Sequence, residues 1–419
     1  MAGTVHIVGA GLAGLSCAVE LASAGMRVVV HEAAGQGGGR CRSYRDDVLG
    51  AVIDNGNHLL LSGNRAVAAY LARIGSQGTL TGPMRAAFPF FDLATGERWT
   101  FDIGDSRLPF WVLDPARRVP GTAALEYLKG IKFACAAEDD TVTDVVGVDG
   151  QLFRRFWEPM AVAVLNATAE EGAARLLWPV LRDTFGQGGH ACRPLIAARG
   201  LSAAFVDPAL AFLAARGGEV RFNDRLRAVA WQDGRAATLH FTDGDIAMDA
   251  DDAVVVAVPP AVARELLPDV SVPEGSRAIV NGHFRLPVAG KETSFLGLIG
   301  GLAQWVFVRG DIASVTVSAA DAAVDRPSED LAAEMWPEVA RALDLGPIPL
   351  PIHRIVKEKR ATFAQIPGNL RRRPGAKTAW PNVFLAGDWT ATGLPATIEG
   401  AIRSGGTAAA AVAGRAGRA

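Results

Sequence analysis

The sequence has little of what marks several large classes of protein. Only 4 of its 419 residues are cysteine, and they show no CxxC pair or other metal-ligand spacing, so no metal is expected. The formal net charge is -2, which gives no electrostatic basis for binding nucleic acid. No apolar run reaches the roughly 18 residues needed to span a bilayer, and the N-terminus lacks the basic region and cleavage site of a signal peptide. These absences favour a reducing, cytoplasmic setting.

What the sequence does contain is enough apolar material for a large core. With 419 residues and a hydrophobic content of 49%, the chain is long enough for two or more domains. A nearly apolar stretch from Ser294 to Val308 is interrupted by Gly300, Gly301 and Gln304. The interruption predicts two strands joined by a tight turn.

A glycine-rich turn near the N-terminus lies between a predicted strand and a predicted helix. The strand is Thr4 to Val8, and the turn GAGLAG contains Gly9, Gly11 and Gly14. After the helix, a second apolar strand, RVVVHE, ends at Glu32. The pattern predicts a βαβ unit with an acidic residue at the end of its second strand.

This arrangement is typical of a dinucleotide site. The first glycine permits the tight turn, the second lets the backbone approach a pyrophosphate, and the third lets the helix pack closely. The helix N-terminus then faces the phosphates with its partial positive charge. Glu32 is placed to accept hydrogen bonds from an adenosine ribose and argues against a 2′-phosphate. The motif predicts FAD or NAD and does not choose between them.

Two further stretches favour FAD. In GQGGGRCRSYR, which follows the second strand, Gly39 and its neighbours allow close backbone approach, and Arg40 adds positive charge opposite phosphate. The stretch VIDNGNHLLL then predicts a strand followed by a turn that contains Gly56 and Asn57. Polar residues this dense, beside an apolar run, indicate a loop that faces a ligand.

With the C-terminal sequence AGDWT, these elements resemble one superfamily. The βαβ unit with Glu32, the GGR that precedes Ser43, the D-x-G turn at Asp54 and AGDWT occur in the order seen in the amine oxidase and phytoene desaturase superfamily of FAD flavoproteins. The resemblance implies an α/β fold in which a GR2-like, Rossmann-type FAD-binding domain is interleaved with an α+β substrate domain. The expected FAD-binding domain comprises residues 1–60, 195–265 and 360–419, and the expected substrate-binding domain comprises 60–195 and 265–360.

The same resemblance implies individual contacts with FAD. Gly387 and Asp388 are expected at the ribityl and pyrophosphate region, and Val229 is expected to pair its backbone with adenine. A helix that begins near Ala396 is expected to point its N-terminus at the flavin ring, where partial positive charge stabilises a reduced, anionic flavin. No cysteine follows Cys192, so FAD is expected to be noncovalent. The expected cofactor contacts are Gly9, Gly11, Ala13, Gly14, Glu32, Gly39, Arg40, Gly56, Asn57, Val229, Gly387, Asp388, Ala396, Thr397 and Ile398.

The two segments assigned to the substrate domain are rich in large aromatic side chains. Seven lie between Phe88 and Trp111, and four more lie between Phe153 and Trp178. They predict an apolar tunnel for a long substrate, since burial of apolar surface contributes roughly 25 cal/mol per Å². The first of these stretches is also expected to touch a membrane surface, where such substrates dissolve.

Within the superfamily, the chain resembles the squalene-associated FAD enzymes, the hydroxysqualene dehydroxylases of bacterial hopanoid synthesis. The stretches that carry this resemblance are DNGNHLLLSGN, IVNGHF, QWVF, VKEKRATFAQIP and GDWTATGLPATIEGAIRSG. It implies an oxidoreductase that reduces hydroxysqualene, a long apolar isoprenoid with an allylic alcohol, to squalene. FADH2 would donate the hydride, and an external partner would reduce the flavin.

Such a reaction needs a proton for the departing hydroxyl and surroundings that tolerate positive charge. His58 is the first candidate acid, because histidine titrates near neutral pH; a structural role is the competing interpretation. Trp389 is a candidate wall of the flavin pocket, where its π face would stabilise a cation, with core packing as the alternative. Glu399 is a reserve acid unless it simply pairs with Arg403, four residues further along the same helix.

Three other functions remain open at this stage. A carotenoid-type desaturase or isomerase would share the fold, the cofactor and the apolar tunnel. A flavin amine oxidase would need an amine site, and Asn281 stands where such enzymes place a lysine near the flavin. A non-catalytic prenyl-binding escort, of the Rab escort kind, would have little reason to retain both Glu32 and AGDWT.

Overall fold

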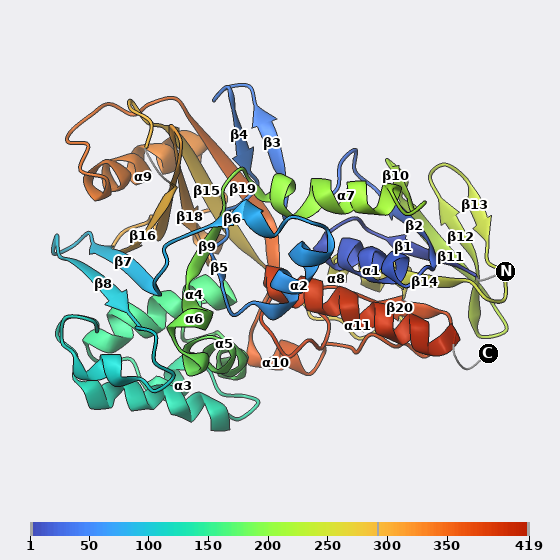
Figure 1. Ribbon diagram of the computed structural model, residues 1–419, viewed down its shortest axis with the longest axis horizontal. Helices are drawn as coiled ribbons and strands as arrows, with labels where there is room; N and C mark the ends of the chain where they lie inside the picture. Colours follow the sequence, from blue (N-terminus) through green and yellow to red (C-terminus); the bar gives the residue numbers. More distant parts are fainter. Residues whose placement is uncertain (1–2, 291–292, 417–419) are drawn as a thin grey trace.

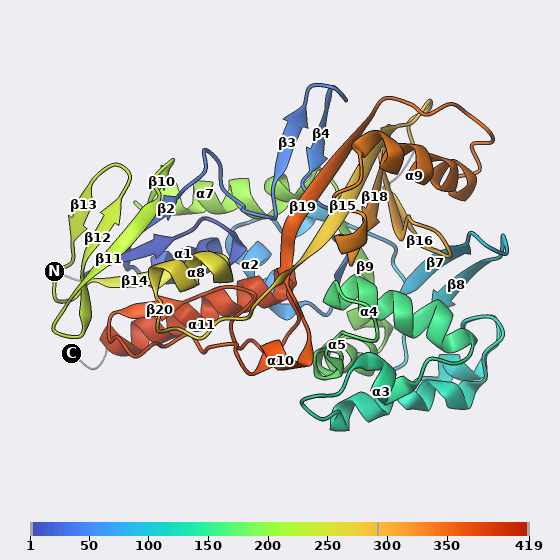
Figure 2. The same cartoon turned by 180° about the vertical axis from the view of Figure 1, so that it is seen from behind.

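The computed structural model describes residues 3–290 and 293–416 (Figure 1). One part of the molecule holds both chain ends and is built on a five-stranded parallel sheet in the order β10-β2-β1-β14-β20. A seven-stranded sheet in the order β19-β15-β18-β17-β16-β7-β8 forms the other part, with a group of helical segments beside it (Figure 2). The chain passes between the two parts several times.

The parallel sheet is the middle of three layers. Its strands are short, β-branched and buried on both sides, as expected when both faces are covered. In β1, Val5 and Ile7 pack against helices α1, α7 and α11, whereas Val8 faces the antiparallel sheet β11-β12-β13. The strands of this layer are β1 (Thr4–Val8), β2 (Arg27–Glu32), β10 (Glu219–Phe222), β14 (Ala253–Val256) and β20 (Val383–Leu385).

The covering layers come from distant parts of the chain. The elements are α1 (Leu12–Ser23), α2 (Arg65–Arg73), α7 (Asp207–Ala214), α8 (Pro260–Leu266), α11 (Ile398–Ala416), β11 (Leu226–Gln232), β12 (Arg235–Phe241) and β13 (Asp245–Ala247). The predicted βαβ unit is confirmed as β1-α1-β2. Turns at Asp233-Gly234 and Asp243-Gly244 join the antiparallel strands β11, β12 and β13.

The seven-stranded sheet separates two further cores. Helix α9 packs on one face with Met335 and Trp336, and the helical segments lie against the other. The predicted turn at Gly300-Gly301 joins the antiparallel strands β16 and β17, as expected. The strands of this sheet are β7 (Ala87–Asp92), β8 (Arg98–Asp102), β15 (Ser276–Arg285), β16 (Ser294–Ile299), β17 (Trp305–Arg309), β18 (Ile312–Val317) and β19 (His353–Phe363).

The remaining helices and strands are short, with the exception of α9 (Ser328–Ala342). They are β3 (Ser43–Asp46), β4 (Ala51–Asp54), β5 (Leu60–Leu61), β6 (Leu80–Thr81), β9 (Pro194–Ala197), α3 (Val142–Val146), α4 (Glu158–Leu165), α5 (Leu177–Asp183), α6 (Gly189–Cys192) and α10 (Pro367–Leu370). Two 3-10 helices, η2 (Phe110–Leu113) and η3 (Ala124–Cys135), lie in the helical group.

The aromatic residues that predicted a tunnel have a different role. Phe88, Phe90, Phe101 and Trp111 are buried and belong to one core cluster with Phe156. Their rings touch one another: Phe101 and Trp111 meet edge-on with centroids 4.8 Å apart. The expectation that these four side chains line a tunnel is therefore wrong, because neighbouring side chains enclose each of them, whereas Phe110 of the same stretch is exposed. Their hydrophobicity is accounted for by packing.

Close packing of α1 against α11 generates a test of the fold. A Cβ atom at Gly405 would lie 2.3 Å from the carbonyl oxygen of Ala13, whereas a Cβ at Gly406 would meet nothing within 4 Å. We expect Gly405→Ala to lower the free energy of unfolding by about 1–3 kcal/mol through overpacking. Gly406→Ala should raise it by up to about 1 kcal/mol through helix propensity. Urea unfolding of both variants checks this; equal effects would contradict the close contact.

Candidate active site

Two glycine-rich segments lie against each other at the carboxyl end of the parallel sheet. The backbone N–H of Gly38 donates to the carbonyl of Ala10 at 2.7 Å, and Gly11 and Gly38 form an isolated parallel bridge. Gly39 is exposed, and a Cβ at Gly11 would meet open space. The two loops thus present accessible backbone beside the N-terminus of α1, which suits a phosphate.

Glu32 holds the turn in this position. Its Oε2 accepts a hydrogen bond from the N–H of Ala10, and its Oε1 accepts one from the N–H of Ala34, both at 2.8 Å. The carboxylate therefore links the glycine turn to the loop after β2. Each carboxylate oxygen can accept more than one hydrogen bond, so this arrangement leaves capacity for a ribose hydroxyl.

Two other residues of the glycine motif, Ala13 and Gly14, are buried in α1 and pack against the protein interior. A Cβ at Gly14 would lie 1.9 Å from the carbonyl oxygen of Gly9, so only glycine allows the helix to follow the turn this closely. Ala13 and Gly14 thus support the turn on its inner side.

Val229 lies in β11, the edge strand of its sheet, where one side of the backbone is available for pairing with a ligand.

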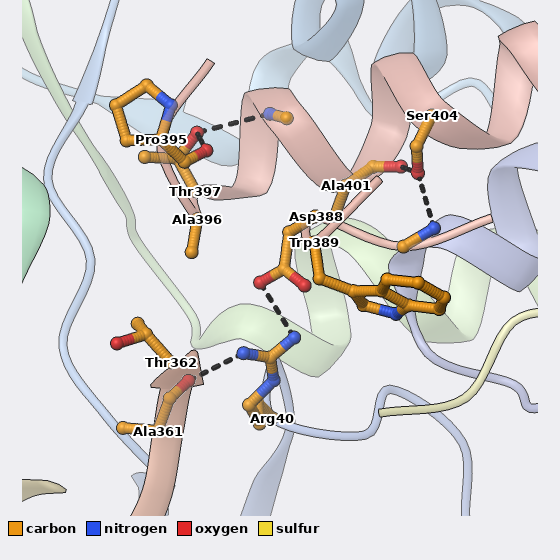
Figure 3. Close-up of polar contacts among 12 residues, drawn as sticks. Arg40, Ala361, Thr362, Asp388, Trp389, Pro395, Ala396, Thr397, Ala401 and Ser404 are labelled. Atoms are coloured by element: carbon orange, nitrogen blue, oxygen red, sulfur yellow. Dashed lines mark hydrogen bonds and ion pairs between the residues drawn. The ribbon is translucent and has the colours of Figure 1, made fainter. Parts of the chain in front are cut away.

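Arg40 joins three segments that are far apart in the sequence (Figure 3). Its Nη2 lies 2.8 Å from Oδ2 of Asp388, and its Nη1 donates to the carbonyl of Ala361 at 2.5 Å. The Asp388 carboxylate raises the pKa of Arg40 further above its usual value. Asp388 is buried, whereas the Arg40 side chain is 40% exposed and remains accessible to an anionic ligand. The pair connects the GGR loop with the AGDWT segment.

Trp389 does not wall a pocket. It is 1% exposed, it belongs to the core cluster behind the parallel sheet, and its indole N–H donates to the carbonyl of Val258 at 2.8 Å. The prediction of a catalytic contact through its π face is wrong, because protein atoms enclose the ring. A Cβ at Gly387 would lie 2.4 Å from Nε1 of this indole, so the tryptophan instead fixes the conformation of the AGDWT turn.

The predicted start of the C-terminal helix is confirmed. Helix α11 begins at Ile398, and the hydroxyl of Thr397 accepts a hydrogen bond from the N–H of Gly400 at 3.1 Å, as an N-cap does. The N–H of Ala396 donates to Oε1 of the buried Gln365 at 2.7 Å. Figure 3 shows Ala396 and Thr397 above the Arg40–Asp388 pair. The positive end of a 19-residue helix therefore lies near that pair.

The loop after β4 lines a small pocket between the two parts of the molecule. Asn57, His58 and Arg309 are among its lining residues. Asp54 accepts hydrogen bonds from the Ser43 hydroxyl at 2.5 Å and from Arg309 at 2.8 Å, so its role is structural. Asp54 and Arg309 fix one side of the pocket.

His58 has an unusually acidic imidazolium. Burial lowers its pKa to about 4, and the nearby Asp54 carboxylate only partly offsets this effect. At pH 7 only about one His58 in a thousand would carry the second proton. The side chain is therefore a neutral imidazole near neutrality, able to donate one N–H or to accept one hydrogen bond.

Polar residues behind this loop were missed by sequence reasoning. The amide of Asn57 donates to the Thr316 hydroxyl at 3.0 Å, and that hydroxyl donates to Oδ1 of Asn281 at 2.9 Å. The Asn281 amide lies 3.3 Å from the carbonyl of Asn55, next to Gly56. Asn281 thus supports the loop from the sheet. Only the spacing of polar residues on two neighbouring strands could have indicated this network.

Glu399 is an anchor for another helix. Its two carboxylate oxygens accept hydrogen bonds from the backbone N–H groups of Ala66 and Val67, at 3.0 and 2.9 Å, and thereby cap the start of α2. Arg403 also approaches it at 3.2 Å, as the spacing of four predicts. With both oxygens engaged in the structure and a side chain that is 8% exposed, Glu399 does not serve as a reserve acid.

A three-layer fold with a glycine cradle, an acidic residue after the second strand and a returning C-terminal helix defines a dinucleotide-binding flavoprotein. A family model described as flavin containing amine oxidoreductase matches residues 12–413, and the chain belongs to this family. It is therefore an oxidoreductase that uses a flavin.

Curated relatives cover the chain nearly end to end. It is 47% identical over 410 residues to hydroxysqualene dehydroxylase of Rhodopseudomonas palustris, with 98% of each chain covered. It is 46% identical over 405 residues to the protein of the same name from Sinorhizobium fredii, with 97% of each covered. A probable zeta-carotene desaturase of Synechococcus elongatus is 23% identical, with 97% of each covered.

Solved structures support the fold. Cyclohexylamine oxidase from Brevibacterium oxydans matches with a TM-score of 0.68 and 16% identity, covering all of both chains. Wild-type putrescine oxidase bound to putrescine matches with a TM-score of 0.69 and 16% identity, covering 99% of each. At this level of identity the likeness shows the architecture alone.

The Arg40–Asp388 pair generates a prediction about the cofactor site. Arg40→Gln leaves the Asp388 carboxylate buried without its cation, so we expect the free energy of unfolding to fall by about 1–3 kcal/mol. Flavin retention after gel filtration should fall as well. Arg45→Gln, a change at an exposed arginine of the same segment, serves as the matched control. Indistinguishable behaviour of the two variants in denaturant and in flavin content would rule out this role for Arg40.

Proposed function

We propose that the protein is an FAD-dependent hydroxysqualene dehydroxylase, which reduces hydroxysqualene to squalene with noncovalently bound FADH2. The observation that carries the proposal is the 47% identity, over 98% of both chains, with a relative of that name. The probable zeta-carotene desaturase covers a similar share of the chain, 97%, but at 23% identity. A snake L-amino-acid oxidase, from Bungarus fasciatus, matches only 17% of the chain.

The residues at the site fit FAD. The accessible backbone of Gly11 and Gly39 and the N-terminus of α1 suit its pyrophosphate, and Glu32 suits the adenosine ribose. Arg40 offers a positive charge beside these loops. The chain has no cysteine after Cys192, so a cysteine link near AGDWT is impossible and binding is noncovalent.

The N-terminus of α11 completes the proposed cofactor site. Gly387, Asp388, Ala396, Thr397 and Ile398 bring the positive end of that helix toward the Arg40 region. Negative charge on a reduced flavin is stabilised at such a position. Gly9, Ala13 and Gly14 shape the turn from behind, Gly56 and Asn57 belong to the loop beside the pocket, and Val229 offers an edge-strand backbone for adenine.

The overall change breaks one allylic C–O bond and forms one C–H bond, and the hydroxyl leaves as water. A bound reduced flavin supplies the hydride, and an external reductant restores it. His58 lines the pocket, and its protonated form would give the departing hydroxyl the proton that it needs to leave as water. The Asp54–Arg309 pair holds the opposite side of the pocket in place. The protein would act in the cytoplasm, at the surface of the membrane that holds its substrate.

An anaerobic reaction tests the proposal. Photoreduced protein is mixed with hydroxysqualene in detergent, and both the flavin absorbance and the extracted isoprenoid are followed. Reoxidation of the flavin with an equal amount of squalene is expected, because each turnover uses two electrons. Squalene itself, in place of hydroxysqualene, is the control and should leave the flavin reduced. Reduction of the oxidised flavin by a carotenoid-type polyene, with no reaction of hydroxysqualene, would instead favour a desaturase, because desaturation removes two electrons from its substrate.

The pKa of His58 gives a pH prediction. If the imidazolium donates the proton, kcat/KM should rise up to about tenfold per unit as the pH falls from 8 toward 5. In His58→Asn this dependence should disappear, whereas exposed His190→Asn should keep it. The range stops at pH 5 because a histidine whose pKa is lower in the folded state loses stability as the pH falls from 6.5 toward 4. A pH profile unchanged by His58→Asn would show that another group gives the proton.

A further inference from the structure

The helical group of the substrate part exposes an unusual number of large apolar side chains. Six of them occur within 24 consecutive residues and are between 56% and 78% exposed. Five of them lie on η2 and η3, and Leu108 shortly precedes η2, in the teal region at the end of the molecule remote from both chain ends (Figure 1). We call these six residues the apolar patch. Its members are Leu108, Phe110, Leu113, Leu125, Leu128 and Ile131.

The geometry of η3 arranges three of them in a straight row. A 3-10 helix has three residues per turn, so side chains three positions apart eclipse one another. Leu125, Leu128 and Ile131 therefore form one line along the exposed face. The row on the opposite side contains Phe133, which is buried and stacks near Trp157 with ring centroids 5.3 Å apart. The helix is thus apolar on two sides, one facing the core and one facing outward.

The second helix extends the same surface. In η2, Phe110 and Leu113 are again three residues apart and exposed, and Leu108 precedes them. Trp111, between them, turns inward and meets Tyr127 of η3 with ring centroids 5.1 Å apart. This contact fixes η2 beside η3. The patch is therefore part of a folded surface held by aromatic packing.

Basic residues adjoin the patch. Residues 104–137 contain five basic and three acidic residues, and the acidic residues Glu138 and Asp139, which follow, are paired with Arg371. The carboxylate of Glu126 turns back to the N–H of Ala123, and that of Asp114 turns to the N–H of Ala116. Arg107 and Lys132 are exposed. An apolar surface with a cationic rim is complementary to an anionic lipid surface.

We propose that the apolar patch docks the protein on the surface of a bilayer that contains anionic lipids. Phe110, Leu113 and the row on η3 would enter the acyl boundary, while Arg107 and Lys132 would meet the headgroups. No helix in the described ranges, 3–290 and 293–416, is long and apolar enough to cross a membrane, so this contact is peripheral. The patch shares Leu108 and Phe110 with the end of the Phe88–Trp111 stretch, whereas Phe88, Phe101 and Trp111 of that stretch are buried.

The position of the patch suits the proposed substrate. The core beneath it includes Phe101, Trp111 and Phe156, and Leu59 and Leu61 pack against the same core. Leu59 directly follows His58 of the pocket loop, and Leu61 lies in the next strand, β5. A substrate that dissolves in lipid would thus reach the protein on the part that carries the pocket. This argument rests on the proposed function, whereas the exposure and the charge of the patch do not.

Vesicle binding tests the docking. Flavin-loaded protein is floated with substrate-free vesicles of phosphatidylcholine, with and without phosphatidylglycerol. A triple variant, Leu125→Ser, Leu128→Ser and Ile131→Ser, should lower the vesicle-bound fraction by about tenfold or more, because its apolar row is lost. Met84→Ser with Val288→Ser is the matched control, since both residues are exposed and apolar but lie outside the patch. This control should bind as the wild type does.

A second variant addresses the charges and any loss of folding. Arg107→Gln with Lys132→Gln should remove the gain caused by phosphatidylglycerol while leaving the flavin content and the unfolding midpoint unchanged. Unaltered vesicle binding by the triple serine variant would overturn the proposal. The proposal would also fail if the wild type is a dimer in the absence of vesicles and the triple variant is a monomer. In that case a second copy of the chain covers the patch. Because the vesicles contain no substrate, vesicle binding without dehydroxylation in detergent would contradict only the proposed function.

Discussion

The structure depends on one contact between segments that the sequence keeps far apart. Arg40, in the loop after the βαβ unit, holds the Asp388 carboxylate near the C-terminus and the carbonyl of Ala361 at the end of β19. A buried carboxylate without a cation is strongly unfavourable, so the three segments have to meet. Their meeting brings the glycine loops, the end of the long strand and the start of α11 to one place.

Backbone proximity makes this meeting possible. Gly38 bonds to Ala10, and Gly405 lets α11 lie against α1 with no room for a side chain. The helix that lies closest to α1 is thus the one whose N-terminus lies near Arg40. Glu399, in its first turn, also caps α2 through Ala66 and Val67. A single C-terminal helix therefore orders the cofactor side of the site and the first helix after the pocket loop.

Local patterns predicted what depends on neighbours in sequence. The βαβ unit and the β16–β17 turn follow from strand periodicity and turn residues, whereas the start of α11 was expected from the family resemblance. The roles of Trp389 and Glu399 follow from neither. The bond from the Trp389 indole to Val258 spans 131 positions, and the bonds from Glu399 to α2 span more than 330. No pattern along the chain carries such information, so side chains of suitable chemistry were assigned to the site although they serve the fold.

Local sequence patterns also failed to predict which residues of the helical group are buried and which are exposed. A spacing of three apolar residues usually marks the buried face of a helix, and large aromatic residues in a loop-rich segment look exposed. Here the reverse largely holds, because the rings of Trp111, Tyr127 and Phe133 meet Phe101, Phe156 and Trp157 on the inner side, and only Phe110 of η2 is exposed. Once that face is filled, a helix with three residues per turn has only two rows left. One of them carries Glu126, Lys129 and Lys132, and the row of Leu125, Leu128 and Ile131 is left on the outside. The exposed row is therefore a consequence of how the core is filled, and its chemistry determines what can cover it.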